Sequence, residues 1–262
     1  MHHHKAVEIK NLDYIYPDGT AALRGIDLAI ENGESVALLG PNGAGKSTLL
    51  LHLNAILQGS GELKIFDLPI VRENIREIRR RVGVVFQDPD DQLFSPTVYE
   101  DVAFGPMNMG LARNEVESRV RKALAEVGMT GFENKAAYHL SFGQKKRVAT
   151  ATVLSMEPDI LALDEPSSNL DARGRRELLD ILIGLPVTKI VITHDLPFVI
   201  EVCERAVIMD DGKIVVDGPV DELFADEDLL ERHGLELPLG FEELRSRARA
   251  HYKISRLKRK KL

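Results

Sequence analysis

A glycine-rich segment at residues 40–48 has the residue types and the spacing of a phosphate-binding loop. It reads Gly-Pro-Asn-Gly-Ala-Gly-Lys-Ser-Thr, between a strand-like stretch at 35–39 and a helical pattern at 46–57. Glycines let successive backbone N–H groups point at phosphate oxygens, and the first turn of a helix adds partial positive charge. Lys46 can reach the β- and γ-phosphates, and Ser47 can ligate Mg²⁺. A glycine-rich turn without a ligand is the less favoured interpretation, because strand, loop and helix occur together. The predicted nucleotide-binding residues are Asn42, Gly43, Ala44, Gly45, Lys46, Ser47 and Thr48.

Two acidic residues follow an apolar run at 160–163. A buried strand of this kind would deliver Asp164 at its carboxyl end, where a carboxylate can ligate Mg²⁺. Glu165 stands one residue further on and could activate a water molecule. The alternative is a simple preference for acids at a helix N-terminus, which the phosphate-binding loop makes the minority interpretation.

The elements that must position these residues alternate between strand and helix. Short β-branched runs bounded by Gly, Pro, Asn or Asp occur at 7–13, 35–39, 82–86, 160–163 and 189–193. Helical patterns separate them, at 46–57, 113–127, 142–155, 172–182 and 196–203. The alternation predicts an α/β fold with buried, largely parallel strands. Turn sequences at 17–19 and 31–34 indicate an antiparallel N-terminal β portion, and residues 209–213 indicate a hairpin between strands at 205–208 and 214–217.

Composition limits the class of protein. The 262 residues are 44% apolar and 29% charged, enough for a sizeable core. No run reaches the 18 or more apolar residues typical of a membrane span. The single cysteine, Cys203, and the absence of a secretory leader favour a reducing cytoplasm. The histidine run at 2–4 is interpreted as an expression remnant or frayed end.

Further motifs, in order along the chain, resemble those of ATP-binding-cassette ATPases over residues 5–218. Tyr16 matches the aromatic residue that stacks on adenine, Gln87 the Q-loop and His194 the switch histidine. Residues 140–144, Leu-Ser-Phe-Gly-Gln, resemble the signature motif, and residues 168–171 resemble the D-loop. The resemblance implies an α/β P-loop NTPase fold with a mainly parallel central sheet, an N-terminal antiparallel β portion and a helical signature subdomain. It places the cassette domain at 5–240, its helical subdomain at about 88–155, and a basic tail at 241–262.

The same resemblance implies how ATP and Mg²⁺ are used. ATP would lie between the phosphate-binding loop of one subunit and Ser141, Gly143 and Gln144 of a second. Glu165, His194 and Gln87 would act in hydrolysis, and Mg²⁺ would be held by Ser47, Gln87 and Asp164. Phe142 departs from the common Leu-Ser-Gly-Gly-Gln form, so either its ring turns outward or this half of the site is weakened. A tolerated packing residue is the favoured interpretation.

Other segments narrow the resemblance to the energy-coupling-factor branch, the CbiO-type ATPases. These segments are 14–19, 86–98, 101–106 and 228–235. That branch drives uptake of cobalt, nickel or vitamins from the cytoplasmic face of the membrane. Its ATPase pairs with a second ATPase, a transmembrane coupling protein and a substrate-binding membrane protein. Aromatic residues within 88–106 suggest a surface for such a partner, with core packing of one or two rings as the competing account.

Two questions stay open at the level of sequence. A soluble cassette acting on nucleic acid or ribosomes is the alternative function, although the chain lacks the long heptad insertion and the second cassette of such proteins. The tail carries nine Lys or Arg residues and no acid over 245–262, within a chain of net charge −7. Three interpretations fit this tail: in descending order of preference, a solvated end, a contact with anionic lipid and a nucleic-acid-binding segment. Because nucleic-acid binding ranks last, no nucleic-acid partner is expected.

Overall fold

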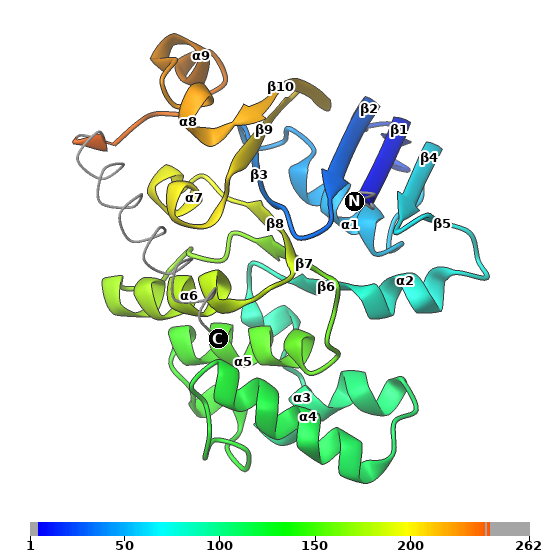
Figure 1. Cartoon of the computed structure of the whole chain (residues 1–262), viewed down its shortest axis with the longest axis vertical. Coiled ribbons are helices and arrows are strands. Elements are labelled where there is room, and N and C mark those ends of the chain that lie inside the picture. The colour runs from blue at the N-terminus through cyan, green and yellow to red at the C-terminus, as the bar shows by residue number, and fades with distance from the viewer. Residues whose placement is uncertain (1–4, 239, 242–262) are drawn as a thin grey trace.

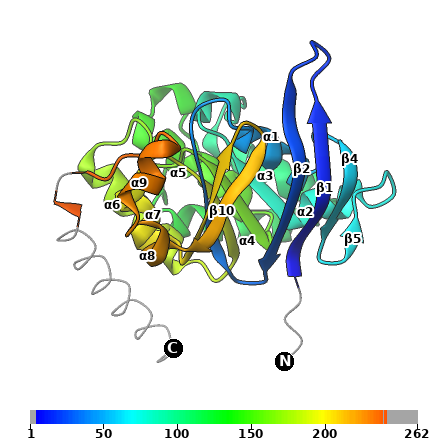
Figure 2. The same cartoon turned by 90° about the horizontal axis from the view of Figure 1, so that it is seen from above.

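Two sheets and a group of helices make up the described structure (Figure 1). The computed structural model describes residues 5–238 and 240–241. The histidine run and all of the basic tail except Phe241 lie outside these residues. Seen from above, the smaller sheet stands at one side of the molecule (Figure 2).

The smaller sheet has four strands in the order β2-β1-β4-β5, paired antiparallel. They are β1 (Lys5–Ile15), β2 (Ala21–Glu31), β4 (Ser60–Ile65) and β5 (Leu68–Pro69). This confirms the antiparallel N-terminal portion, and it places the stretch 7–13 here rather than among the parallel strands.

The larger sheet has six strands in the order β10-β9-β3-β8-β7-β6. They are β3 (Ser35–Leu39), β6 (Val82–Val85), β7 (Ile160–Asp164), β8 (Thr188–Ile192), β9 (Arg205–Asp210) and β10 (Lys213–Pro219). Strands β3 and β6–β9 run parallel, and β10 closes one edge as an antiparallel hairpin with β9. β3, β6, β7 and β8 are buried along nearly their whole length, as expected for parallel strands covered on both faces.

Nine α-helices surround the sheets in the part of the chain that the structure describes. They are α1 (Lys46–Leu53), α2 (Ile75–Arg81), α3 (Val98–Asn108), α4 (Arg113–Glu126), α5 (Phe142–Leu154), α6 (Ala172–Gly184), α7 (Leu196–Val202), α8 (Val220–Leu223) and α9 (Glu227–Arg232). Short 3₁₀ turns occur at η1 (Pro89–Asp91) and η2 (Ala137–His139). None of the helices described is both long and apolar enough to cross a membrane.

The helices belong to three apolar clusters. One lies between the two sheets and includes Leu49 of α1, and a second packs α6, α7 and α8 on the other face of the large sheet. The third joins α3, α4 and α5 through residues such as Val102, Val120 and Val148. In Figure 1 these three helices form the lower end of the molecule, away from α1 and the small sheet.

The structure differs from the sequence prediction at two helices near the site. The helical pattern at 46–57 ends at Leu53, because Ala55 is left-handed (φ 57°) and the Asn54 side chain accepts a hydrogen bond from Ile56 N. α3 was not predicted, although Thr97 and Glu100 have the spacing of a capping box. In the structure Thr97 Oγ1 accepts from Glu100 N, and Glu100 Oε2 accepts from Thr97 N.

Candidate functional site

The phosphate-binding loop joins the end of β3 to the start of α1, as predicted. Gly40 (φ 132°) and Gly45 (φ 96°, the N-cap of α1) are left-handed, and a Cβ at either would overlap a backbone carbonyl, of Met209 or Ala22 respectively. The loop curls around Lys46, whose Nζ donates to the carbonyls of Gly40 and Pro41 at 2.8 Å. The loop therefore holds its lysine in place.

The remaining loop residues differ in exposure. Asn42, Gly43 and Ser47 are exposed, whereas Ala44 and Thr48 are buried. Burial lowers the pKa of Lys46, although the negative charges of Glu165 and Asp164 oppose the shift. The Lys46 ammonium and the exposed backbone of the loop would attract a polyphosphate, whereas the two nearby carboxylates would repel it unless a bound cation such as Mg²⁺ offsets their charge.

Tyr16 is tied to the helix that follows the loop. Its hydroxyl lies 3.0 Å from Thr48 Oγ1, and its ring meets Tyr14 edge to face with centroids 4.9 Å apart. The residue predicted to stack on adenine thus lies beside the predicted phosphate site, on the turn between β1 and β2.

Asp164 ends β7 and lies next to the phosphate-binding loop. Ser47 hydrogen-bonds to its carboxylate; burial nevertheless raises the pKa of Asp164. A hydroxyl and a carboxylate are the hard oxygen donors that Mg²⁺ prefers, so this pair fits the predicted ion. Gln87 is exposed on the turn after β6. β6 pairs with β7 in the register Val85 to Leu163, so Gln87 lies at the same edge of the sheet as Asp164.

Glu165 and His194 are brought together by neighbouring strands. His194 Nδ1 lies 2.9 Å from Glu165 Oε1, and Thr193 Oγ1 donates to Oε2 at 3.1 Å. The Glu165 carboxylate is 14% exposed and the His194 ring 78% exposed. Glu165 N donates to Ile192 O, and Glu165 itself is left-handed at φ 44°. Both carboxylate oxygens are therefore engaged, one of them by a ring that is open to solvent.

Thr193 and Lys146 are site residues that the sequence analysis missed. Thr193 follows β8 immediately before His194, and a polar residue at the end of an apolar strand was the available signal. Lys146 is only 2% exposed, and its Nζ donates to Glu165 O at 2.7 Å and to Ser168 Oγ at 3.1 Å. Lys146 lies four residues before Thr150 and seven before Val153, and residues at these spacings share one face of a helix. That face of α5 is buried, so the spacing was the available signal that Lys146 is buried too.

The predicted signature residues form the start of α5. Ser141 is the N-cap: its Oγ accepts from Gln144 N at 3.3 Å, and Gln144 Oε1 accepts from Ser141 N at 3.0 Å. Ser141 is exposed, and Gly143 is half-buried. The Phe142 ring centroid lies 5.7 Å from Lys146 Nζ, so the ring turns along α5. That position agrees with a packing residue.

The segment 168–171 connects the Glu165 backbone to α6. Ser168 Oγ donates to Glu165 O at 2.7 Å, and Asp171 caps α6 by accepting from Gly174 N at 2.7 Å. One turn into α6, Arg175 Nε donates to Asp195, the residue after His194, at 2.9 Å. The residues flanking Glu165 and His194 are therefore linked to one helix.

Asp195 is ionised within this link. Burial opposes ionisation, but the hydrogen bonds from Arg175 and from Phe198 N outweigh it and lower the pKa of Asp195. As the N-cap of α7, Asp195 fixes the chain immediately after His194.

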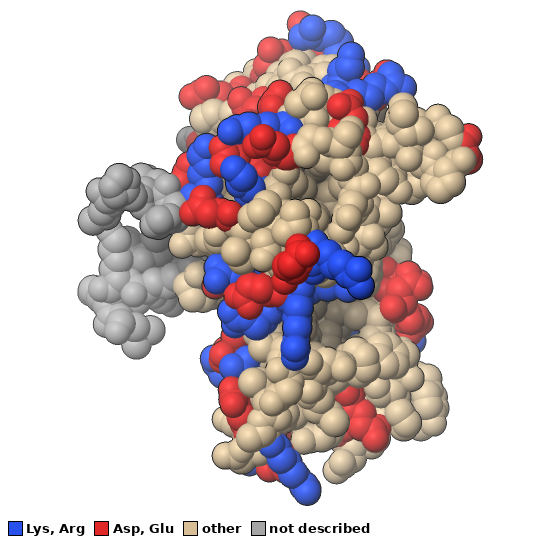
Figure 3. Space-filling view, turned by 90° about the vertical axis from the view of Figure 1, so that its right-hand side faces the viewer, with Lys and Arg blue, Asp and Glu red and all other residues tan. Residues whose placement is uncertain are grey.

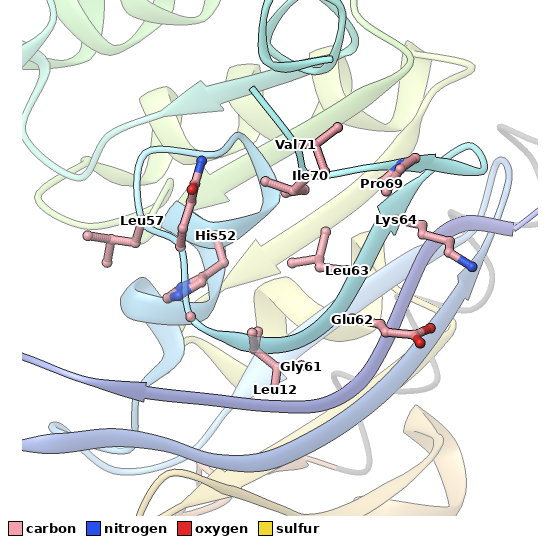
Figure 4. Close-up of a pocket in the computed structure, with 12 residues that line it drawn as sticks. Leu12, His52, Leu57, Gly61, Glu62, Leu63, Lys64, Pro69, Ile70 and Val71 are labelled. Atoms are coloured by element: carbon pink, nitrogen blue, oxygen red, sulfur yellow. The ribbon is translucent and has the colours of Figure 1, made fainter. Parts of the chain in front are cut away.

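A pocket of about 390 Å³ with a mixed polar and apolar lining lies apart from this site, between β1, β4 and the loop after α1 (Figure 4). Leu12, Leu63 and Ile70 line it together with His52, whose Nδ1 lies 2.8 Å from Thr48 O. None of the predicted site residues lines this pocket, so the chemistry is assigned to the edge of the large sheet.

Comparison with known proteins finds relatives that cover most of the chain. The family model described as ABC transporter matches residues 23–168. An energy-coupling factor transporter ATP-binding protein, EcfA, of Methanocaldococcus jannaschii is 50% identical over 238 residues, which cover 88% of this chain and 85% of the relative.

Two solved structures are similar. CbiO1 from Clostridium perfringens, described as part of the ABC transporter complex CbiONQ, is 42% identical with a TM-score of 0.78, covering 87% of this chain and 94% of that one. A dimeric ATP-binding cassette in a post-hydrolysis state, bound to ADP and Pi, is 28% identical with a TM-score of 0.73, covering 82% of this chain and 98% of that one.

Proposed function

The chain belongs to the ABC transporter family of ATPases, and we propose that it powers an energy-coupling-factor transporter. In this proposal ATP hydrolysis at a two-subunit site drives uptake of a cobalt ion, a nickel ion or a vitamin through membrane partners. The similarity to EcfA and to CbiO1 supports the subtype. The observation that carries the hydrolytic part is the gathering of Lys46, Ser47, Asp164 and Glu165 at one edge of the sheet.

The residues divide the work of hydrolysis. The backbone of residues 42–48 and Lys46 would bind the phosphates, and Tyr16 would stack on the base. Ser47, Asp164 and Gln87 would hold Mg²⁺, which neutralises phosphate charge when bound. Glu165 would accept a proton from the attacking water or orient that water, and His194 would hold the water near the γ-phosphate. Phosphoryl transfer needs little covalent chemistry from the protein. These residues would therefore act by positioning the reactants and by stabilising the charge that develops in the transition state.

A second subunit is needed because one chain does not complete the site. Ser141 caps a helix of the α3–α5 cluster, whereas Lys46 begins α1, whose Leu49 belongs to the cluster between the sheets. We therefore place Ser141 and Gly143 of one subunit opposite Lys46 of the other, an arrangement consistent with the dimeric cassette to which the fold is similar. The Ser141 Oγ already accepts from Gln144 N, so its O–H is available to donate to a phosphate oxygen.

The membrane partner is proposed to dock in a groove of about 1280 Å³ beside α3. Phe94 and Phe104 line it and are 67% and 51% exposed, with ring centroids 5.0 Å apart. Figure 3 shows basic and acidic side chains side by side across the middle of one face, above a hollow. The arginines that line the groove are Arg72, Arg76, Arg79, Arg80 and Arg119. An apolar floor with a charged rim suits one side of a cytoplasmic helix of the coupling protein.

The position of the groove connects the partner to the nucleotide. Phe86 and Gln92, on either side of the turn that carries Gln87, line it as well. Gln92 accepts from Phe86 N at 3.2 Å and donates to Ala149 O of α5 at 2.8 Å. A helix seated here would therefore contact both the Gln87 turn and the signature helix. From the similarity to EcfA and CbiO1, which are named as parts of transporters, we infer that the protein works at the cytoplasmic face of the membrane.

Purification from detergent-solubilised native membranes tests the transport function. The tagged chain should recover at least two integral membrane proteins, the coupling protein and the substrate-binding protein. Recovery of ribosomes or nucleic acid without integral membrane proteins would favour the alternative, a soluble cassette. The transported substrate is then identified by uptake assays on the recovered complex with cobalt, nickel and vitamins.

Substitutions in the groove should weaken partner binding without disturbing the rest of the protein. We expect Phe94→Ser with Phe104→Ser to reduce recovery of the membrane partners at least tenfold, because buried aromatic anchors typically contribute about 2 kcal/mol or more. Asp90 is left unchanged, because it pairs with Lys145 of α5 at 2.6 Å. The matched control is Val215→Ser, an exposed apolar residue on β10. Recovery at the parental level by the double variant would contradict the assigned docking surface.

A further inference from the structure

Lys146 is a buried ammonium that makes no direct ion pair among the described residues, although the negative charges of Glu165, Asp164 and Asp88 favour its charged form. It lies on α5, five residues after Ser141, and is 2% exposed. Both of its hydrogen-bond acceptors are neutral: the carbonyl of Glu165 at 2.7 Å and Ser168 Oγ at 3.1 Å. A buried ammonium is costly unless its hydrogen bonds are made. The placement of Lys146 therefore needs an explanation beyond packing.

The residue that Lys146 holds is the proposed catalytic glutamate. Glu165 has φ 44°, a left-handed conformation that is rare outside glycine, asparagine and aspartate. Its N–H donates to Ile192 O at 2.8 Å, and its carbonyl accepts from Lys146 Nζ and from Ser168 Oγ. Hydrogen bonds on both sides of the residue hold its backbone in this conformation. The direction of the carboxylate depends on that backbone.

Lys146 also joins two parts of the molecule. Its helix belongs to the α3–α5 cluster, whereas Glu165 follows a strand of the large sheet. A shift or rotation of α5 would move Nζ relative to the Glu165 carbonyl. Because Ser141 and Gly143 begin the same helix, the hydrogen bond connects the surface that meets a second subunit to the backbone of the proposed base.

Phe142 covers this connection. Its ring centroid lies 5.7 Å from Lys146 Nζ, within the range of a cation–π contact. The aromatic residue in the signature segment thus contacts the ammonium that holds Glu165.

We propose that Lys146 is a positioning residue for hydrolysis: by donating to the carbonyl of Glu165 and to Ser168, it sets the direction of the Glu165 carboxylate according to the position of the signature helix. This rests on the proposed role of Glu165 as the base. It predicts that loss of the ammonium slows the chemical step while ATP binding is kept.

The test compares Lys146→Met, Lys146→Gln and the matched control Lys122→Met, which removes an exposed ammonium from α4. Steady-state hydrolysis of Mg-ATP and the affinity for a fluorescent ATP analogue are measured on each purified protein. Lys146→Met should lower kcat at least tenfold with KM and nucleotide affinity within about twofold. Lys146→Gln, which keeps an N–H donor, should recover part of kcat, and Lys122→Met should match the parent.

Glu165→Gln supplies the second arm. If its kcat stays at the parental level, Glu165 is not the base, and the hydrolytic mechanism of the proposed function fails together with the inference about Lys146. If Glu165→Gln stops turnover but Lys146→Met does not change kcat, only the inference about Lys146 fails. Combining the two should cause no further loss of kcat, and the double variant should still bind nucleotide and self-associate with Mg-ATP as Glu165→Gln does. Parallel losses of kcat and nucleotide affinity in both Lys146 variants would assign Lys146 a structural role and overturn the proposal.

Discussion

At the scale of single residues, the site is a set of side chains already held by hydrogen bonds within one chain. Lys46 donates to two carbonyls of its own loop, and Glu165 is held by Thr193 and His194. The residue types at these positions could be predicted from sequence, because a glycine-rich loop before a helix and acids after a buried strand have few other uses. Lys146 could not be assigned, since its acceptors are a backbone carbonyl and a serine hydroxyl on a distant segment.

The first prediction concerns Lys46. Lys46→Ala should weaken ATP binding by about 2 kcal/mol, roughly thirtyfold, because a charged hydrogen-bond donor to the phosphates is lost. The carbonyls of Gly40 and Pro41 also lose their donor, so the loop should become more mobile. Equilibrium binding of a fluorescent ATP analogue measures the change. Lys10→Ala, an exposed residue of β1, is the control, and unchanged affinity in Lys46→Ala would contradict the role of the lysine.

Among the helices and strands, the sequence predicted the buried parallel strands most accurately, because burial on both faces alone determines their apolar pattern. The runs at 35–39, 82–86 and 160–163 are strands within one residue of the expected bounds, because parallel strands covered on both faces are continuous apolar stretches. α3 was missed because Gly105 and Pro106 are residue types typical of a turn, although Val98 and Val102 have helical spacing. Phe94 and Phe104 are exposed in the groove, where the partner is proposed to dock, whereas Tyr99 packs on the α3–α5 cluster, so core packing accounts for that ring.

The capping box of α3 gives a prediction at this scale. Thr97→Ala should lower the free energy of unfolding by about 1 kcal/mol, because Glu100 N loses its acceptor at the first turn of the helix. Denaturant titration followed by circular dichroism measures the change. Thr130→Ala, in an exposed turn, should change stability by less than half of that amount. Equal stability of the two variants would mean that the capping box does not support α3.

At the scale of the whole molecule, the parallel order of the strands places the reacting groups together. β3, β6, β7 and β8 end at one edge of the sheet, and the phosphate-binding loop, Gln87, Asp164 and the Thr193–His194 pair follow those ends. This gathering follows from the alternation of strands and helices, so the sequence was sufficient to predict it. The proposed position of Ser141 opposite a nucleotide involves a second chain, and the sequence pattern of a single chain does not contain the geometry between two subunits.

ATP-dependent association of Glu165→Gln shows whether two subunits form the nucleotide site. Glutamine keeps the shape and one acceptor of the side chain but cannot take a proton, so binding should be kept while hydrolysis falls at least a hundredfold. With Mg-ATP, size-exclusion chromatography coupled to light scattering should show Glu165→Gln at about twice the monomer mass, and at the monomer mass without nucleotide. Glu165→Gln with Ser141→Arg, which puts a bulky cation at the signature, should remain monomeric. A monomer under all conditions, together with parental turnover of Glu165→Gln, would contradict the account.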